Sequence, residues 1–338
     1  DNTLINYTDA FIYGAHRFEL IPKNWRGKKL ELQEFIHSYS DGEHLWQSLQ
    51  GKVYGHWIHK AKLFHGAYRF LWRCRQRGWT TIVVSHKTEH GHFDSERISL
   101  RDAAKDFLQS CNVWDPDGSG LLEELWFETT RAEKLQTIAK LGCDVFVDDL
   151  SEVLGNPAFP QTTRGILFDP TNQHKSTQME RALSWEELGS LILGELDVSE
   201  LSALVESCGL PAVSEVERVP GGGNSRVYQV LTTSGKKFAL KVYPFDPSHD
   251  RLRSEFEGLR LIHSKGDYPI PVSVGADRYL EVATFEWVDG ESVRNPKLED
   301  AVQAVDFISC LHQLSKQAEF ADFSKASAAC LSGEEIEQ

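Results

Sequence analysis

Helical segments alternate with short apolar strands over the first 195 residues of this chain. Two helix-then-strand pairs and one further strand make up the pattern: helix 64–77 with strand 80–84, helix 131–141 with strand 145–147, and strand 165–168. Strands this short and this apolar are typical of buried, parallel sheets. The alternation therefore predicts an α/β fold with a doubly wound parallel sheet, in which ligands bind at the carboxyl ends of the strands.

Two other regions differ from this pattern. Residues 15–58 have helix-like spacing of their apolar residues and are expected to form a small helical insert. After about residue 195 the sequence predicts a β-rich lobe with one helix, followed by helical sequence after 297. Because 338 residues exceed one ordinary domain, we expect two domains, 1–195 and 196–338.

Composition limits the partners of the chain. Its 36 basic and 50 acidic residues give a formal charge of −14, which argues against nucleic acid or an anionic membrane as a partner. No run approaches the roughly 18 apolar residues of a membrane span. The six cysteines are scattered without a C-x-x-C motif, which favours a reduced, cytoplasmic protein. A phosphate-bearing ligand must therefore be captured by local features.

Four short motifs occur in one order along the first domain. They are Asp1-Asn2-Thr3-Leu4-Ile5, the strand 81–85 that ends at Ser85, the helix residue Lys134, and the strand 145–149 that ends at Asp148-Asp149. In this order and spacing, residues 1 to about 195 resemble the haloacid dehalogenase (HAD) superfamily of phosphohydrolases. The insert 15–58 occupies the place of the family's cap, which selects the substrate.

The resemblance implies a role for each motif. Asp1 matches the family's acid and base, and the nucleophilic aspartate is expected two residues before it, so the sequence reads as cut within its own active site. Ser85 would hold a phosphoryl oxygen, and Lys134 would offset negative charge, with Lys140 as the alternative lysine. Asp1, Asp148 and Asp149 would hold Mg²⁺ through carboxylate oxygens.

Other polar groups in this domain have simpler interpretations. Five basic residues of the insert would meet a second anionic group of the substrate, although ordinary surface charge is the preferred interpretation: Arg17, Lys23, Arg26, Lys28 and Lys29. The segment 115–120 copies half of a calcium loop but lacks its final glutamate, so a plain turn is expected. His86, His90 and His92 are assigned to a polar loop because no matching ligand set accompanies them.

A second constellation lies between residues 220 and 243, where a glycine-rich turn connects two expected strands. Such a turn lets backbone amides approach phosphate groups, and a lysine on the next strand reaches them as a fixed charge. The expected nucleotide-binding residues are Gly222, Gly223, Asn224, Ser225, Lys241, its partner Glu255 (with Glu257 as the alternative), and the hinge residues Glu286 and Val288.

These motifs resemble the aminoglycoside phosphotransferase and choline kinase-like family, which shares the protein-kinase-like fold. The resemblance implies ATP binding and phosphoryl transfer to a small molecule. It covers only the N-lobe and part of the next lobe, because nothing after Gly290 supplies the family's catalytic aspartate and asparagine. The sequence thus reads as cut before its catalytic loop as well.

The combined hypothesis is a cytoplasmic, Mg²⁺-dependent HAD-type phosphatase of a small phosphorylated metabolite, fused to an ATP-dependent, kinase-like phosphotransferase domain. Two alternatives remain open. The first alternative is a catalytically silent nucleotide-binding or regulatory protein. The second is that the first domain is a HAD-type dehalogenase, which cleaves a carbon–halogen bond.

Overall fold

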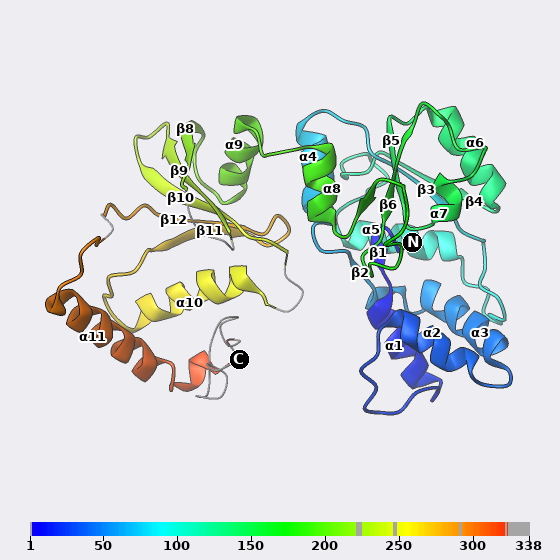
Figure 1. Ribbon diagram of the computed structural model, residues 1–338, viewed down its shortest axis with the longest axis horizontal. Helices are drawn as coiled ribbons and strands as arrows, with labels where there is room; N and C mark the ends of the chain where they lie inside the picture. The colour runs from blue at the N-terminus through cyan, green and yellow to red at the C-terminus, as the bar shows by residue number, and fades with distance from the viewer. Residues whose placement is uncertain (1, 221–224, 246–248, 291–292, 322, 324–338) are drawn as a thin grey trace. The chain divides into compact units, whose positions relative to one another are not determined.

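The computed structural model describes residues 2–220, 225–245, 249–290, 293–321 and 323. The chain divides into two compact units, Asp1–Glu195 and Leu196–Gln338. The first unit contains β1 (Ile5–Asn6), α1 (Thr8–Arg17), α2 (Lys29–His37), α3 (Gly42–Tyr54), η1 (Ile58–Lys60), β2 (Lys62–Leu63), α4 (Ala67–Gln76), β3 (Ile82–His86), α5 (Leu100–Ser110), β4 (Glu124–Glu128), α6 (Arg131–Leu141), β5 (Val145–Asp148), α7 (Ser151–Leu154), β6 (Arg164–Phe168), β7 (Arg181–Ala182) and α8 (Trp185–Ile192) (Figure 1).

The main strands of this unit are parallel, but they form two sheets rather than one. β3 pairs with β4, and β5 pairs with β6, which pairs in turn with β7. Among the described residues, β3 and β5 do not pair with each other. One continuous doubly wound sheet, as expected from the sequence, is therefore not observed.

The two sheets nevertheless share their helical layers. Val84 of β3 and Phe146 of β5 belong to one buried cluster that includes Leu135 and Ile138 of α6. Alternate residues, such as Val83 and Val147, pack instead against the larger core of the unit. Because side chains on a strand alternate between its faces, both sheets present corresponding faces to the same two layers.

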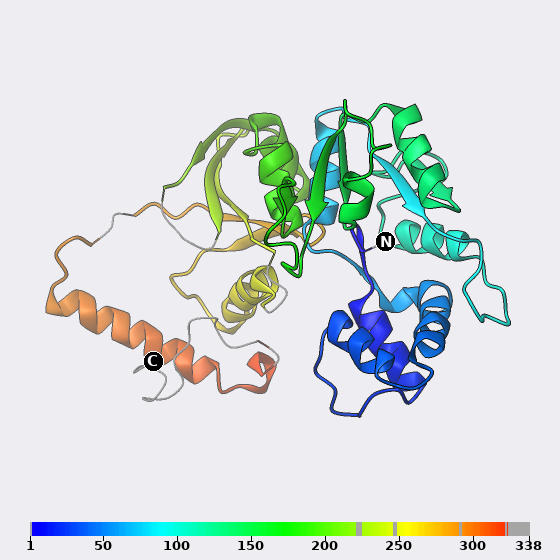
Figure 2. The same ribbon diagram turned by 45° about the vertical axis from the view of Figure 1, so that its right-hand side comes forward.

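The helical insert is made of α1, α2 and α3, which lie together beside the sheets in both views (Figures 1 and 2). Its helices begin at Thr8 rather than near residue 15, because α1 follows β1 directly and the Thr8 amide donates to Asn6 Oδ1. Phe11 stacks on Trp46 with ring centroids 4.9 Å apart, joining α1 to α3. The insert is thus packed through its own aromatic core.

The second unit is built on one antiparallel sheet in the order β11-β12-β10-β9-β8. Its elements are α9 (Val198–Ser207), β8 (Val213–Arg218), β9 (Arg226–Thr232), β10 (Lys237–Val242), α10 (Arg251–Lys265), β11 (Ser273–Asp277), β12 (Val282–Glu286), α11 (Leu298–Leu314) and η2 (Ala318–Phe320). Tyr243, Leu252, Ala283 and Phe285 form a buried cluster between α10 and the sheet.

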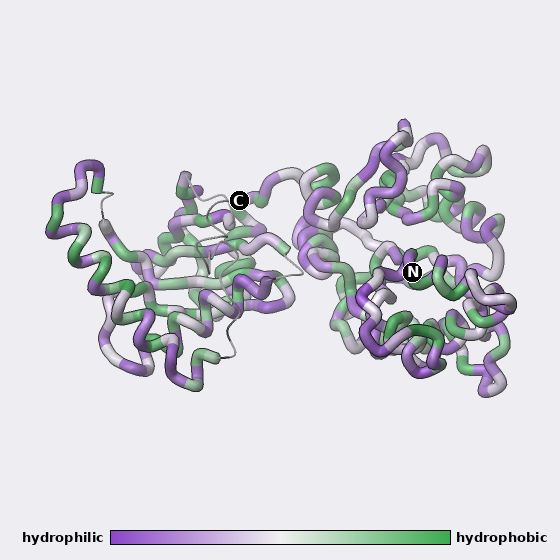
Figure 3. Tube along the Cα trace, turned by 60° about the horizontal axis from the view of Figure 1, so that its bottom comes forward, coloured by the Kyte–Doolittle hydropathy of each residue, from purple (hydrophilic) through white to green (hydrophobic). Residues whose placement is uncertain are grey.

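α11 differs from the other helices in its exposure. Hydrophobic and hydrophilic residues alternate along it (Figure 3), yet Leu298, Val305 and Ile308 each expose more than half of their surface, at 81%, 60% and 63%.

Within the described part of the chain, no helix is long and apolar enough to cross a membrane.

Candidate functional site

A cavity of about 660 Å³ lies in the first unit between β3 and β5. Its polar lining includes Thr3, Ser85, Lys134, Asp148 and Asp149. Ser85 is the next-to-last residue of β3, because this strand continues through His86, and Asp148 is the last residue of β5. The structure therefore brings the sequence-predicted residues Ser85, Lys134, Asp148 and Asp149 to one cavity, whereas Asp1 lies outside the described residues.

Lys134 reaches this cavity from the first turns of α6. The helix begins at a capping box, in which the Thr130 hydroxyl accepts from the Glu133 amide and the Glu133 side chain accepts from the Thr130 amide. Lys134 is buried, and its ammonium forms an ion pair and hydrogen bond with Asp148. Lys140 is exposed and lies over the Trp126 ring, 5.5 Å from its centroid. Of the two lysines, only Lys134 faces the aspartates.

The adjacent aspartates have different surroundings. Asp148 is buried; Oδ2 pairs with Lys134, and Oδ1 accepts from the Leu150 amide at 3.0 Å. Asp149 is partly buried and uses Oδ1 to accept from the Thr3 hydroxyl at 2.7 Å. Within the described residues, Asp149 Oδ2 accepts no hydrogen bond. A hard carboxylate oxygen of this kind suits Mg²⁺, so the donor set fits a magnesium site centred on Asp149 better than one centred on Asp148.

Basic groups surround the same edge. The sequence named Lys29 among five insert residues that would meet a second anionic group, with surface charge preferred, and it did not name Lys87. Lys29, at the start of α2, donates to Asn2 Oδ1 at 2.7 Å. Burial lowers the pKa of Lys29 to about 8, although the Asp149 carboxylate raises it. Tyr54 of α3 also bonds Asn2, and burial raises the pKa of Tyr54 to about 12. The helical insert thus contributes Lys29 and Tyr54 directly beside the aspartates.

Lys87 is the second basic group and follows β3 directly. It is only 4% exposed, and its ammonium lies 4.9 Å from the Tyr54 ring centroid. Burial lowers the pKa of Lys87 to about 7. The position of Lys87, two residues after Ser85, was a sequence signal that could have indicated its place beside the site. The positions of Lys29 and Tyr54 depend instead on contacts between distant segments.

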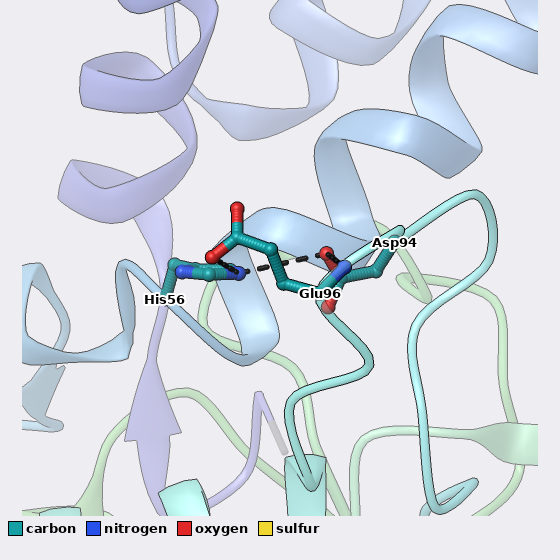
Figure 4. A group of neighbouring side chains, drawn as sticks. All are labelled: His56, Asp94 and Glu96. Carbon is teal, nitrogen blue, oxygen red and sulfur yellow. Dashed lines mark hydrogen bonds and ion pairs between the residues drawn. The ribbon is translucent and has the colours of Figure 1, made fainter.

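A separate cluster of potential metal ligands joins α3 to the loop after β3. His56, Asp94 and Glu96 bring one ligand atom each to within 4.8 Å of one another (Figure 4). Lys52 Nζ is bonded to all three, at 2.7 Å from Asp94 Oδ1, 3.0 Å from Glu96 Oε1 and 3.1 Å from His56 Nε2. Because the Lys52 ammonium already bridges these three groups, the cluster is a network of ion pairs and hydrogen bonds rather than a metal site.

The histidines that follow Ser85 are placed apart from one another. His86 Nε2 contacts the Thr129 carbonyl at 2.9 Å, and His90 Nδ1 contacts the Ile98 carbonyl at 3.3 Å. Asp115 and Asp117 accept hydrogen bonds from amides two residues ahead, as in a polar turn. Neither segment belongs to the group of metal-ligating side chains found among the described residues.

In the second unit, Lys241 of β10 forms an ion pair with Glu255 of α10. Lys241 Nζ lies 2.7 Å from Oε1 and 2.5 Å from Oε2. The buried Tyr243 hydroxyl donates to Glu255 Oε2 at 2.8 Å, while Glu257 pairs with Arg278 and Arg253. The structure thus pairs Lys241 with Glu255 and not with the alternative Glu257.

The other expected nucleotide-binding residues are only partly described. Gly222, Gly223 and Asn224 lie outside the described residues. Ser225 directly precedes β9, and in the register of the sheet Lys241 lies opposite Val227. Glu286 ends β12, and Val288, beyond it, is 62% exposed. Their roles at a hinge remain predictions.

Comparison with known proteins distinguishes the two units. Residues 215–335 match the phosphotransferase enzyme family, APH. No curated protein matches the chain.

Solved structures with local similarity include a putative fructosamine-3-kinase from Thermobifida fusca, at 24% identity and a TM-score of 0.27 over 35% of this chain and 40% of that one. The APH(2″)-IIa in a ternary complex with streptomycin and ATP has 20% identity and a TM-score of 0.23, over 29% of this chain and 31% of that one. Protein tyrosine kinase A of Mycobacterium tuberculosis has 15% identity and a TM-score of 0.37, over 56% of this chain and 94% of that one.

The chain thus spans about 40% of the length of the fructosamine-3-kinase it matches. These matches do not show a HAD-like domain. Residues 215–335 are thus similar to the phosphotransferase enzyme family.

Proposed function

We propose that residues 1–195 form a Mg²⁺-dependent phosphomonoester hydrolase unit that acts on a small phosphorylated metabolite. The observation that carries this proposal is the placement of Ser85, Lys134 and Asp149 on one cavity beside the ends of two parallel strands. Ligands of α/β proteins bind at this edge. In a chain of formal charge −14, a group of lysines at one edge is a local feature suited to an anion.

Each residue has a task in the proposed reaction. The Ser85 hydroxyl and amide hold a phosphoryl oxygen, and the Lys134 ammonium offsets negative charge beside Asp148. Bound Mg²⁺, held by Asp149 with Asp148 beside it, would supply further neutralisation of the phosphoryl group. The nucleophilic carboxylate expected two residues before Asp1 bonds to phosphorus as the ester P–O bond breaks, and Asp1 protonates the leaving oxygen. Water then cleaves the acyl phosphate, and Asp1 accepts its proton.

Lys29 of the insert and Lys87 after β3 favour a substrate with a second anionic group. Lys29 and Lys87 place two ammonium groups near the same edge, one on Asn2 and the other against Tyr54. A carboxylate or second phosphate would gain charge-assisted hydrogen bonds there. This assignment favours a phosphorylated acid or a bisphosphate over a phosphorylated neutral alcohol.

Two extended proteins test the nucleophile. Both carry added residues before Asp1; the aspartate protein has aspartate two positions before Asp1, and the asparagine protein has asparagine there. With Mg²⁺, we expect the aspartate protein to hydrolyse members of a phosphomonoester panel and the asparagine protein to lose at least about 10³-fold in kcat. Lys134→Met should abolish turnover of the aspartate protein, whereas Lys140→Met should not. Equal turnover of the aspartate and asparagine proteins would refute the proposed nucleophile.

The alternatives give different results in the same assays. Turnover of 2-haloacids without turnover of phosphomonoesters would support the dehalogenase hypothesis instead. Absence of both activities from the aspartate protein would favour a silent or regulatory first unit.

The described cysteines Cys74, Cys111, Cys143, Cys208 and Cys310 are free thiols, and a reducing, cytoplasmic location stays a prediction.

For the second unit we propose ATP binding by a small-molecule phosphotransferase. The observation that supports it is the Lys241–Glu255 pair inside the matched segment 215–335, because a lysine at this place needs a fixed carboxylate to point at phosphates. Calorimetric titration with ATP and Mg²⁺ should show weak binding that Lys241→Ala abolishes. Lys237→Ala, on the same strand and exposed, is the matched control; equal loss in both variants would contradict the assignment.

A further inference from the structure

The loop of residues 87–99 connects the end of β3 to α5 and lies against α3 of the helical insert. The contact is made by backbone. A Cβ atom added to Gly91 would lie 2.4 Å from Gly51 Cα, and one added to Gly51 would lie 2.6 Å from the His92 carbonyl oxygen. Two backbones approach this closely only where no side chain stands between them. The loop and α3 are therefore packed backbone to backbone.

Side chains attach the same loop to α3 at two further places. Near the start of the helix, the His44 and Phe93 rings have centroids 4.2 Å apart. Near its end, Lys52 Nζ donates to Asp94 Oδ1 at 2.7 Å and to Glu96 Oε1 at 3.0 Å. Because His44 and Lys52 lie roughly two turns apart, the loop is held over most of the length of α3.

Asp94 both shapes the loop and attaches it to α3. Its side chain is only 1% exposed. Oδ1 accepts from Lys52 and from the Glu96 amide at 3.3 Å, and Oδ2 accepts from the Ile98 amide at 3.1 Å. His56 Nε2 lies 3.5 Å from the same carboxylate (Figure 4). A buried carboxylate that has lost its ammonium partner is strongly unfavourable, so removal of the Lys52 charge should release this turn of the loop.

Two residues of the loop are held in a left-handed backbone conformation. Phe93 has a φ of 57° and Arg97 a φ of 50°. Residues other than glycine rarely adopt this region, and bulky side chains do so least readily. The Phe93 side chain is 61% exposed, so burial of its ring contributes little to the conformation. Such backbone persists only where surrounding contacts impose it, and the contacts of Asp94 lie between these two residues.

The loop also begins beside the candidate site. Ser85 of β3 lines the cavity. Lys87, the first residue of the loop, donates its amide to the Glu128 carbonyl at 2.9 Å and places its ammonium 4.9 Å from the Tyr54 ring centroid. A movement of the loop therefore reaches the carboxyl end of β3 on one side and α3 on the other.

From these contacts we infer that the 87–99 loop fastens the helical insert to the carboxyl end of β3, with Lys52 as the positioning residue. While Lys52 holds Asp94, α3, the loop and the end of β3 move as one body. When this ion pair breaks, the strained loop relaxes and α3 and the end of β3 are released together with it. The inference rests on the proposed function only in that the loop then controls access to the proposed hydrolase site.

Amide hydrogen exchange of the whole chain, without substrate or Mg²⁺, tests this coupling. We expect Lys52→Met to speed exchange at least about tenfold at the loop amides bonded to Asp94, at the Lys87 amide and in α3, while β6 stays protected. Lys52→Arg keeps a cation beside both carboxylates and should restore protection to within about threefold of the wild type. Lys62→Met is the control, because Lys62 pairs with Asp9 on the exposed surface.

Glycine substitutions test the strain separately. Because glycine adopts positive φ readily, Phe93→Gly added to Lys52→Met should slow exchange of the loop and α3 by about threefold or more. Phe93→Gly alone should slow the same exchange in the wild type, and it keeps the test available if Lys52→Met unfolds the whole unit. Glu19→Gly is the matched control, since Glu19 also has a positive φ, of 55°, but follows α1 and lies outside the loop.

The outcomes separate the steps of the inference. Faster loop exchange in Lys52→Met with unchanged exchange in α3 or at the Lys87 amide would overturn the coupling. Equal effects of Lys52→Met and Lys62→Met would also overturn it, as would a failure of Lys52→Arg to restore protection. No slowing by Phe93→Gly, or the same slowing by Glu19→Gly, would overturn the role of strain. Since no reaction takes place in these measurements, a failed phosphatase assay would leave every one of these outcomes unchanged.

Discussion

Lys134 of α6 and Asp148 of β5 form a buried ion pair, with side-chain exposures of 9% and 3%. The pair joins the helix to the strand end that also carries Asp149. Removing one partner of a buried pair leaves a charge without compensation, which destabilises proteins by about 3–5 kcal/mol. The pair therefore has a structural consequence that is separate from any role in phosphoryl transfer.

We expect Lys134→Met to lower the free energy of unfolding by about 3 kcal/mol or more. The double variant Lys134→Met/Asp148→Leu should recover most of that loss, because neither charge remains buried. Urea unfolding of the wild type, both single variants and the double variant gives the coupling energy. Lys140→Met on the same helix is the control. A coupling energy near zero would contradict the ion pair.

Lys87 makes stability depend on pH in the alkaline range. Its folded pKa, lowered by burial to about 7, lies below the ordinary value of 10.5, so the unfolded chain binds more protons between these values. The free energy of unfolding should then rise with pH from about 7 to 10. Lys87→Met should flatten this rise, leaving the smaller part due to Lys29, whose pKa is about 8. The measurement is urea unfolding at pH 6 to 10.

The control for this pH dependence is Lys23→Met, which alters an exposed lysine of the helical insert. Lys23→Met should retain the wild-type slope. If Lys87→Met kept the wild-type slope as well, the ammonium of Lys87 would not be buried in the folded protein.

Asp94 gives the opposite pH dependence in acid. Although burial raises its pKa, hydrogen bonds from Lys52 and from the Ile98 and Glu96 amides hold it at about 2, below the ordinary 3.8. Its contribution to stability is therefore complete above about pH 4 and is lost as the pH falls through about 2. Asp94→Asn should cost about 2 kcal/mol at pH 6, and the difference from wild type should shrink between pH 4 and 2.

Urea unfolding across this acid range measures the effect. Asp9→Asn is the matched control, because Asp9 pairs with Lys62 on the exposed surface and such pairs contribute little. A difference between Asp94→Asn and wild type that stayed constant down to pH 2 would show that the carboxylate is not held by Lys52.

Local patterns in the sequence predicted several elements closely. The expected helix 131–141 agrees with α6, whose ends are set locally by the capping box of Thr130 and Glu133 and by the left-handed Gly142, with φ of 62°. The β9–β10 hairpin and α10 follow from periodicity in the same way. Lys134 lies on α6 and Lys241 on β10. Because these elements were predicted, the spacing along the chain also indicated the partners Asp148 and Glu255.

Contacts between distant segments were not predictable in this way. Lys29 belongs to an insert whose basic residues read as surface charge, yet its ammonium meets Asn2. Lys52 and Asp94 are 42 positions apart, and no local pattern connects them. The separation of the sheet between β3 and β5 was also unforeseen, because apolar strands indicate burial without specifying neighbours.

Tyr243 provides a further test of the ATP site proposed for the second unit, because its hydroxyl donates to the carboxylate that pairs with Lys241. The Tyr243 hydroxyl donates to Glu255 Oε2 at 2.8 Å, and burial together with the Glu255 charge raises the pKa of Tyr243 well above its usual value. The hydroxyl thus remains a donor at every pH used for binding assays. A hydrogen bond to a charged group contributes about 1.5–3 kcal/mol, and part of this would be lost from the orientation of Lys241.

We expect Tyr243→Phe to weaken ATP binding by about three- to tenfold, less than Lys241→Ala does, while leaving the fold intact. Glu255→Gln should weaken binding further, since the amide keeps the shape of the side chain but loses the charge that fixes the ammonium. Calorimetric titration with ATP and Mg²⁺ measures all three variants. Tyr228→Phe, which removes a hydroxyl from a buried tyrosine of the neighbouring strand β9, is the control. If Tyr243→Phe and Tyr228→Phe bound ATP equally well, Glu255 would not be oriented through Tyr243.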